Sequence, residues 1–124
     1  MKKKEGEKVK YNCYVELALD IVGGKWKPII IYYIGLKKVV RFNELKRSIP
    51  SINERMLARQ LKELVKDKVI IRNDYKQVPP KVEYSLEPLG ETLMPIIDSL
   101  KNWSVNYNKH YKKAVFEMEE VEIE

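Results

Sequence analysis

The sequence predicts a mainly α-helical protein with one small β-hairpin, an α+β fold. Two observations support this fold class. Most of the chain between residues 12 and 111 places apolar residues at three- and four-residue steps, which is typical of helices that bury one face. Only two short runs, residues 69–75 and 82–86, have the composition and alternation of β-strands. A chain of 124 residues can bury one core, so we expect a single folded domain.

The composition is that of an ordinary globular protein with a basic surface. Hydrophobic residues make up 44% and charged residues 34% of the chain, which argues against disorder of the whole chain. The 24 lysines and arginines outnumber the 18 acids, and five of those acids lie in the last eight residues. Such a basic body favours a polyanion such as DNA, because neutralising phosphates releases counterions. The alternative is that the lysines only keep the protein soluble.

The ends of the chain and its single cysteine, Cys13, bear on location. One cysteine cannot form an intrachain disulfide, and the first ten residues lack the apolar run of a signal peptide. No stretch approaches the roughly 18 to 20 apolar residues of a membrane span. We therefore expect a cytoplasmic protein without a membrane partner. Its organisation is predicted as a flexible basic arm over residues 1–11, a folded domain over 12–114 and an acidic tail over 115–124.

The first predicted helix covers residues 12–22 and is apolar around nearly its whole circumference. Such a helix must be buried on more than one side, and in so small a domain we expect a second subunit to cover part of it. Gly23-Gly24 ends the helix, since glycine tolerates the left-handed conformation there. A second helix, which we interpret as the core helix, is predicted from Lys27-Pro28 to about Leu36, because proline fits the first helical turn.

The centre of the chain predicts two helices separated by a tight turn. Arg41-Phe42 is expected to form a short bridge or strand, followed by Asn43 as the N-cap of a helix over residues 44–48. Pro50 forbids the continuation of that helix. Asn53 can then cap a longer helix from residue 54 to about 68. This longer helix is amphipathic, with an inward stripe of Leu57, Leu61, Leu64 and Val65 and an opposite basic face of Arg55, Arg59, Lys62 and Lys66.

A hairpin and a long helix complete the predicted fold. Residues 69–75 and 82–86 form the hairpin, and two prolines and two lysines between them predict a stiff, basic, exposed tip. Pro88 can begin the last helix, which Pro95 should kink or split into two segments. The apolar stripe of that helix is long for a one-domain protein, so we expect part of it to pack against a twin subunit. The stripe comprises Leu89, Leu93, Ile96, Ile97, Leu100, Trp103, Tyr107 and Tyr111.

This order of elements is that of a winged helix-turn-helix, a fold that places one helix in the major groove of DNA. In this interpretation Arg55 and Arg59 read bases, Lys62 and Lys66 contact the backbone, and Gln60 or Asn53 addresses adenine or a phosphate. The candidates on the helix are Asn53, Arg55, Met56, Arg59, Gln60, Lys62 and Lys66. In the hairpin they are Arg72, Lys76 and Lys81, with Arg41 and Asn43 in support. The alternatives are an ordinary solvated helix face and an ordinary exposed turn.

Several motifs follow one another along the chain: the run from Cys13 to Ile21, Gly23-Gly24-Lys25-Trp26-Lys27, Arg41-Phe42-Asn43-Glu44-Leu45, Met56-Leu57, Leu61-Lys62-Glu63-Leu64, Val78-Pro79-Pro80-Lys81-Val82-Glu83-Tyr84-Ser85-Leu86, and Leu89-Gly90, Leu93, Pro95 and Trp103. In these motifs the chain resembles the HxlR-type bacterial regulators over roughly residues 12–104. The resemblance implies a dimeric winged helix-turn-helix transcription factor related to the MarR-type regulators. It also implies that the first and last helices form the dimer and that the helix-turn-helix binds an operator.

The dimer interface expected from the resemblance and from the apolar stripes comprises Tyr14, Leu17, Ile21, Leu93, Ile96, Ile97, Leu100, Trp103 and Tyr107. The chain departs from the family pattern at two places. Tyr14 stands where the family often has proline, and Lys37-Lys38-Val39-Val40 replaces a turn that contains glycine. Both departures concern local geometry and not the fold.

In several regulators that this chain resembles at Cys13, the equivalent thiol senses oxidants or electrophiles. A cysteine in the first turn of a helix, with Lys8 and Lys10 nearby, lies where positive potential favours the thiolate. Cys13 is also a candidate N-cap with Glu16 in the capping-box position. The alternative is a small, partly buried residue without a redox role.

Three rival functions stand beside a sequence-specific, homodimeric DNA-binding regulator. Catalysis has little support, because His110 has no partners at metal-ligand spacing and no glycine loop cradles phosphates. We therefore expect no enzyme activity, no metal and no cofactor. A winged helix that binds protein, or DNA without operator readout, is the second rival. The third is a pocket between the last helix and the DNA-binding part for an aromatic small-molecule effector, which the sequence does not locate.

Overall fold

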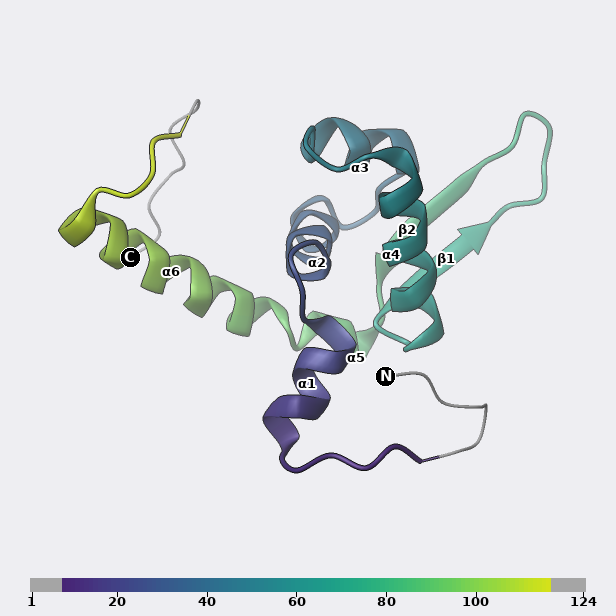
Figure 1. Ribbon diagram of the computed structural model, residues 1–124. Helices are drawn as coiled ribbons and strands as arrows, with labels where there is room; N and C mark the ends of the chain where they lie inside the picture. Colours follow the sequence, from purple (N-terminus) through teal and green to yellow (C-terminus); the bar gives the residue numbers. More distant parts are fainter. Residues whose placement is uncertain (1–7, 117–124) are drawn as a thin grey trace.

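The computed structural model describes residues 8–116, and Figure 1 shows a helical body from which the hairpin and the last helix project. The elements are α1 (Tyr14–Val22), α2 (Lys27–Lys37), α3 (Phe42–Ser48), α4 (Glu54–Lys66), β1 (Ile70–Asp74), β2 (Val82–Leu86), α5 (Pro88–Glu91) and α6 (Met94–Tyr111). The two strands pair antiparallel, from Ile70 opposite Leu86 to Asp74 opposite Val82. The predicted class, mainly α with one hairpin, is therefore confirmed.

The core forms around α2, as predicted for that helix. Ile30, Ile31 and Ile34 are fully buried, and each buried side chain of this size stabilises the fold by about 1.5–3 kcal/mol. The leucine stripe of α4 packs into the same cluster. The other buried members come from the α2–α3 connection, α3, the turn after it and the hairpin: Val40, Leu45, Ile49, Ile52, Val69, Ile70, Tyr84 and Leu86. One apolar core thus joins α2, α3, α4 and the hairpin.

The short bridge and the start of α3 lie earlier than the sequence predicted. Val40, and not Arg41-Phe42, pairs with Tyr84, through N–H···O distances of 2.9 and 2.7 Å in the two directions. Because the Glu44 carboxylate accepts a hydrogen bond from the backbone N–H of Arg41 at 3.1 Å, α3 begins directly after Arg41. Asn43 lies within the first turn of α3, so its predicted role as N-cap is wrong.

Two lysines with positive φ end the helices that precede them. Lys38 has φ 70° directly after α2, in the segment where the family pattern has a turn with glycine. Lys68 has φ 62°, which a right-handed helix cannot accommodate, so α4 ends at Lys66, two residues before the predicted end. The departure from the family pattern at Lys38 is therefore absorbed by a lysine in a conformation that usually favours glycine.

Pro95 splits the last helix, as predicted. It lies in the first turn of α6, and the short α5 precedes it. The start of α6 packs on α2, where a Cβ added at Gly35 would lie 2.3 Å from the Met94 sulfur. Further along, Lys101 Nζ donates to the Tyr32 hydroxyl at 3.2 Å. Beyond these contacts α6 extends away from the body (Figure 1).

Helices α1 and α6 leave large apolar side chains uncovered. No residue of either helix is buried, so the expected burial of α1 on more than one side is not met within one chain. Tyr14 is 87% exposed and Trp103 is 65% exposed. Of the predicted interface residues, Ile21, Leu93 and Ile97 are half-buried and pack against the core of their own chain. None of the helices in residues 8–116 is long and apolar enough to cross a membrane.

Candidate nucleic-acid interface

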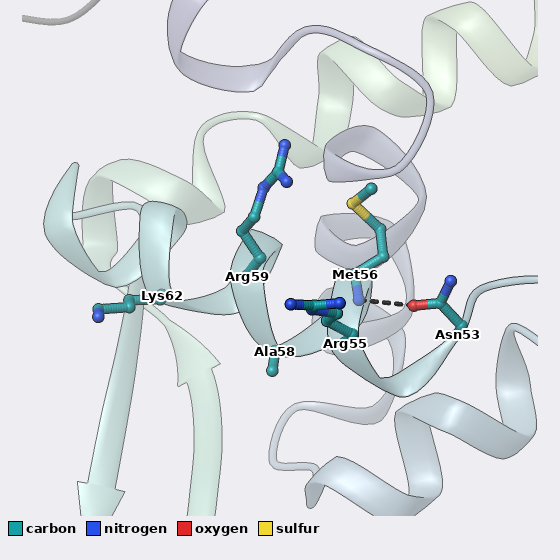
Figure 2. Close-up of a pocket in the computed structure, with 6 residues that line it drawn as sticks. All are labelled: Asn53, Arg55, Met56, Ala58, Arg59 and Lys62. Carbon is teal, nitrogen blue, oxygen red and sulfur yellow. Dashed lines mark hydrogen bonds between the residues drawn. The ribbon is translucent and has the colours of Figure 1, made fainter.

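The N-terminus of α4 is fixed by the cap that the sequence predicted. The Asn53 side chain accepts a hydrogen bond from the backbone N–H of Met56 at 2.8 Å, drawn as a dashed line in Figure 2. Glu54 follows in the first turn, where a negative charge interacts favourably with the helix dipole. This hydrogen bond uses the side-chain oxygen of Asn53. The side-chain nitrogen of Asn53 remains able to donate to a ligand.

Helix α4 has an apolar face and a basic face, as predicted. Leu57, Leu61 and Leu64 are buried against the core. The opposite side exposes four cations over a length of roughly 16 Å, at 1.5 Å per residue. These are Arg55, Arg59, Lys62 and Lys66. A helix with a buried apolar face and an exposed basic face is suited to the major groove. The apolar face holds the helix on the protein, and the basic face is turned toward the phosphates.

The basic face borders a shallow, open depression of about 430 Å³ (Figure 2). It is lined by Asn53, Arg55, Met56, Ala58, Arg59 and Lys62. Arg55, Arg59 and Lys62 project from the helix in different directions. An open surface with three cations suits a long polyanion. A small molecule is usually bound in a concave pocket that encloses most of its surface.

The four cations of α4 differ in their partners. Arg59 Nε lies 3.7 Å from Glu63 Oε2, one helical turn further on. Within residues 8–116, Arg55, Lys62 and Lys66 make no ion pair or side-chain hydrogen bond. Three cations therefore face solvent without an internal counter-charge, and the fourth is partly paired.

Two other predicted residues of α4 lie at the border of the basic face. Met56 is half-buried and packs against the core. Gln60 is also half-buried, and its amide nitrogen lies 3.5 Å from the Met56 sulfur. These two side chains are less accessible to a ligand than the arginines beside them.

Two functional candidates were missed by the sequence reasoning, Lys27 and Glu63. Lys27 is the only buried charged residue in the part of the chain that the structure describes, and its Nζ lies 2.8 Å from Glu63 Oε1. The i, i+4 spacing of Arg59 and Glu63 was a visible signal for part of this cluster. No pattern around Lys27 in the sequence indicates that it is buried.

The hairpin forms a wing, and Tyr75 near its tip contacts two residues of the opposite side, Glu83 and Lys81. The Tyr75 hydroxyl donates to Glu83 Oε1 at 2.7 Å, and this hydrogen bond raises the pKa of Tyr75. Lys81 Nζ lies 4.4 Å from the centroid of the Tyr75 ring, a cation–π contact. Lys81 is therefore half-buried, whereas Lys76 is exposed at the tip. Arg72 is exposed on β1 and lies 3.7 Å from Asp74.

Arg41 links the helix-turn-helix to the wing. Its guanidinium donates to the carbonyl oxygen of Pro80 at 3.2 Å. The neighbouring Val40 pairs with Tyr84, the middle residue of β2 in the same hairpin. Arg41 therefore connects the start of α3 to the wing tip. Asn43 is exposed on α3.

Cys13 lies exposed directly before α1. It occupies the N-cap position, but its side chain makes no capping hydrogen bond. Glu16 accepts a hydrogen bond from the backbone N–H of Asn12 at 2.6 Å, so the predicted capping box with Cys13 is wrong. Nearby, the Tyr11 hydroxyl donates to Asp20, which raises the pKa of Tyr11 and lowers that of Asp20.

Nothing in residues 8–116 forms a group of three or more histidine, cysteine or acidic residues that could hold a metal ion. His110 lies on α6, with Nδ1 3.0 Å from the Asn106 carbonyl oxygen.

Comparison with known proteins agrees with this geometry. Residues 21–112 match a family model described as HxlR-like helix-turn-helix. The helix-turn-helix-type transcriptional regulator YdeP of Bacillus subtilis (strain 168), itself uncharacterised, is 52% identical over 103 residues, which cover 82% of this chain and 79% of YdeP.

Solved structures show the same fold. The redox regulator HypR in its reduced form has a TM-score of 0.75 at 45% identity and covers 82% of this chain and 100% of HypR. The oxidised form of HypR has a TM-score of 0.71 at 50% identity, and the match covers 76% of this chain and 96% of HypR. A protein described as a MarR-family regulator of Porphyromonas gingivalis W83 has a TM-score of 0.72 at 41% identity, with coverages of 80% and 96%. The predicted winged helix-turn-helix is thus confirmed.

The two asparagines near the helix starts provide a test of the capping geometry. Asn53→Ala removes the acceptor for the Met56 N–H and should lower the free energy of unfolding by about 1 kcal/mol. Asn53→Ser should retain most of that stability. Asn43→Ala, within the first turn of α3, should change it by less than about 0.5 kcal/mol. Urea unfolding at equal protein concentrations measures all three, and equal losses for the two alanine variants would contradict the assigned caps.

Proposed function

The chain belongs to the HxlR-like helix-turn-helix family of transcriptional regulators, and from this premise we propose that it binds a specific operator in double-stranded DNA as a homodimer. The observation that carries the proposal is the basic face of α4. Its cations are exposed while its leucines are buried, so the helix can enter a major groove without disturbing the core.

The side chains on α4 divide into two roles. Arg55 and Arg59 are the base readers, because a guanidinium can donate two hydrogen bonds to the O6 and N7 of guanine. Lys62 and Lys66, further along the helix, neutralise phosphates and set the register without reading sequence. Asn53, Met56 and Gln60 lie at the edge of this surface, where the Asn53 amide nitrogen is a donor for a phosphate.

The wing adds contacts to the neighbouring backbone or minor groove. Lys76 at the tip and Arg72 on β1 are exposed for this purpose. Lys81 rests on the Tyr75 ring and contributes positive charge beside the tip. Arg41 and Asn43 support the assembly, Arg41 by holding the wing tip through Pro80.

The homodimer is proposed to form through α1 and α6. Both helices carry exposed apolar side chains that a single chain leaves in water, an arrangement typical of an interaction surface. The residues concerned include the predicted Tyr14, Ile96, Leu100, Trp103 and Tyr107, and also Val15, Leu19 and Tyr111. The rings of Trp103 and Tyr107 are stacked and those of Tyr107 and Tyr111 are tilted, with ring centroids 5.3 and 4.8 Å apart. A two-fold dimer would present two α4 helices to a pseudo-palindromic operator.

A second candidate function is regulation through Cys13. Its thiol is exposed and stands at the start of α1, beside the proposed dimer surface. HypR, whose oxidised and reduced structures resemble this chain, is described as a redox regulator. Oxidation or alkylation of Cys13 would add bulk at this surface and thereby change the arrangement of the two α4 helices. A small-molecule effector is the alternative input.

Replacing both base readers tests operator binding. Arg55→Ala with Arg59→Ala should weaken binding to a duplex selected by the wild-type protein by roughly 100-fold or more, since each bidentate arginine contact contributes about 1–3 kcal/mol. The charge-matched control, Lys112→Asn with Lys113→Ala, lies beyond α6 and should bind nearly as the wild type does. Fluorescence anisotropy from low to moderate salt gives both affinities.

The same titration separates the rival functions. Operator readout requires a steep salt dependence together with a preference for the selected duplex over a random one. Equal affinity for every duplex would indicate DNA binding without readout. No affinity for any duplex would favour a winged helix that binds protein.

The dimer is tested by placing a charge on α6. Leu100→Glu introduces a carboxylate into the proposed apolar contact and should convert the dimer to a monomer, because a buried unpaired charge is strongly unfavourable. Val78→Glu, at the 97% exposed wing tip, is the control and should leave the dimer intact. Light scattering after size exclusion measures the mass. A Leu100→Glu dimer, or a monomeric wild type, would contradict the assignment.

Alkylation tests the thiol. Iodoacetamide should change the operator affinity of the wild-type protein and leave that of Cys13→Ser unaltered, since the chain has no other cysteine. Complete modification of Cys13, verified by mass spectrometry, with no change of affinity would remove the sensing role while leaving DNA binding in place.

A further inference from the structure

We propose that Lys27 is a positioning residue for operator binding, because it neutralises Glu63 and thereby keeps Arg59 available to DNA. The inference rests on the proposed function and names a residue that does not itself touch the duplex. Lys27 is 8% exposed, at the first position of α2, and so cannot contact phosphates from there.

Lys27 requires a counter-charge at its position. A buried ammonium loses its hydration, and at the N-terminus of α2 it also meets the positive end of the helix dipole. Glu63 supplies the counter-charge, with its Oε1 2.8 Å from Lys27 Nζ. The other contact of Glu63 with a cation, to Arg59 Nε, is longer, at 3.7 Å. The short separation and the burial of Lys27 tie the side chain of Glu63 to the start of α2.

Glu63 would oppose DNA binding without this partner. It lies one turn after Arg59 on α4, and its side chain is 44% exposed beside the basic face. A bare carboxylate there would repel phosphates and would pair closely with Arg59, which would cancel one of the two charges assigned to base reading. Because the Coulomb energy grows as the separation falls, Lys27 at 2.8 Å holds Glu63 more strongly than Arg59 does at 3.7 Å.

The remaining contact between Glu63 and Arg59 has a useful geometry. It engages Nε of the guanidinium, and within residues 8–116 the two terminal nitrogens make no hydrogen bond. Figure 2 shows the Arg59 guanidinium extended away from the helix. Glu63 thus steadies the inner side of Arg59, while the outer nitrogens are left to donate to a base.

The experiment compares the variants K27M, E63Q and the double variant K27M/E63Q with the wild type. Methionine keeps the unbranched shape of lysine without its charge, and glutamine keeps an acceptor without the carboxylate. The control is K25M. Lys25 lies two residues before Lys27, and its Nζ contacts the Trp26 ring and not Glu63. The probe is a fluorescent duplex of about 30 base pairs, three helical turns, selected from a randomised pool with the wild-type protein. Anisotropy gives the affinity, and circular dichroism gives the melting temperature.

We expect K27M to weaken operator binding about tenfold, equivalent to about 1.4 kcal/mol, and K25M to bind as the wild type does. E63Q should bind at least as tightly as the wild type. The double variant should recover the wild-type affinity within about twofold, because the uncompensated carboxylate is gone. A role of Lys27 in packing alone predicts no such rescue, since glutamine at position 63 cannot restore lost packing. A role of the ion pair in folding stability alone predicts that the affinities follow the melting temperatures, whereas the inference predicts a loss of affinity for K27M at temperatures where the variant is fully folded.

Two results would overturn the inference: wild-type affinity for K27M, or a double variant as weak as K27M. If K27M does not fold, the inference is tested with E63Q and the double variant. Binding weaker than that of the wild type by E63Q, or more than about twofold weaker by the double variant, overturns it. Failure of the wild-type protein to prefer the selected duplex over a random one would instead contradict the proposed function. The two failures are thus distinguishable.

Discussion

The burial of three leucines of α4 in the core that they share with the isoleucines of α2 determines how the rest of the molecule is used. Withdrawing one fully buried leucine from such a contact costs about 1.5–3 kcal/mol, and turning α4 about its axis would withdraw all three. The rotation of α4 is therefore set by the core and not by its ligand. The same rotation places Arg55, Arg59, Lys62 and Lys66 outward, so their direction follows from packing that lies behind them.

The small size of that core explains the other exposed features. It involves α2, α3, α4 and the hairpin, and α1 and α6 contribute only half-buried residues at their inner ends. Their outer apolar faces remain without cover in a single chain. The core and the surface proposed for dimerisation therefore lie on different helices. The polar cluster of Lys27, Glu63 and Arg59 lies on the core side of this division, next to the surface proposed for DNA.

Much of the fold and of the α4 surface was predictable from sequence. The order of elements, the Asn53 cap, the two faces of α4 and the split at Pro95 follow from periodicity and from the restricted geometry of proline. The start of α3 was not predictable, because Arg41 and Asn43 are both plausible N-cap residues. The hydrogen bond from the Arg41 N–H to the Glu44 carboxylate places the N-cap at Arg41. Lys27 was not predictable either, since its burial depends on a residue 36 positions away. The contact of Lys81 with Tyr75 likewise depends on how the wing closes.

The two attachments of the wing have a consequence for how this fold can diverge. Val40 pairs with the middle of β2 and Arg41 donates to Pro80 near the tip, so two adjacent residues fasten a hairpin located some forty residues further along the chain. These two contacts fix the position of the wing relative to the start of α3. Under the proposed function, exchanging the outward side chains of α4 would change the target sequence, whereas the length of DNA that one subunit spans would stay the same.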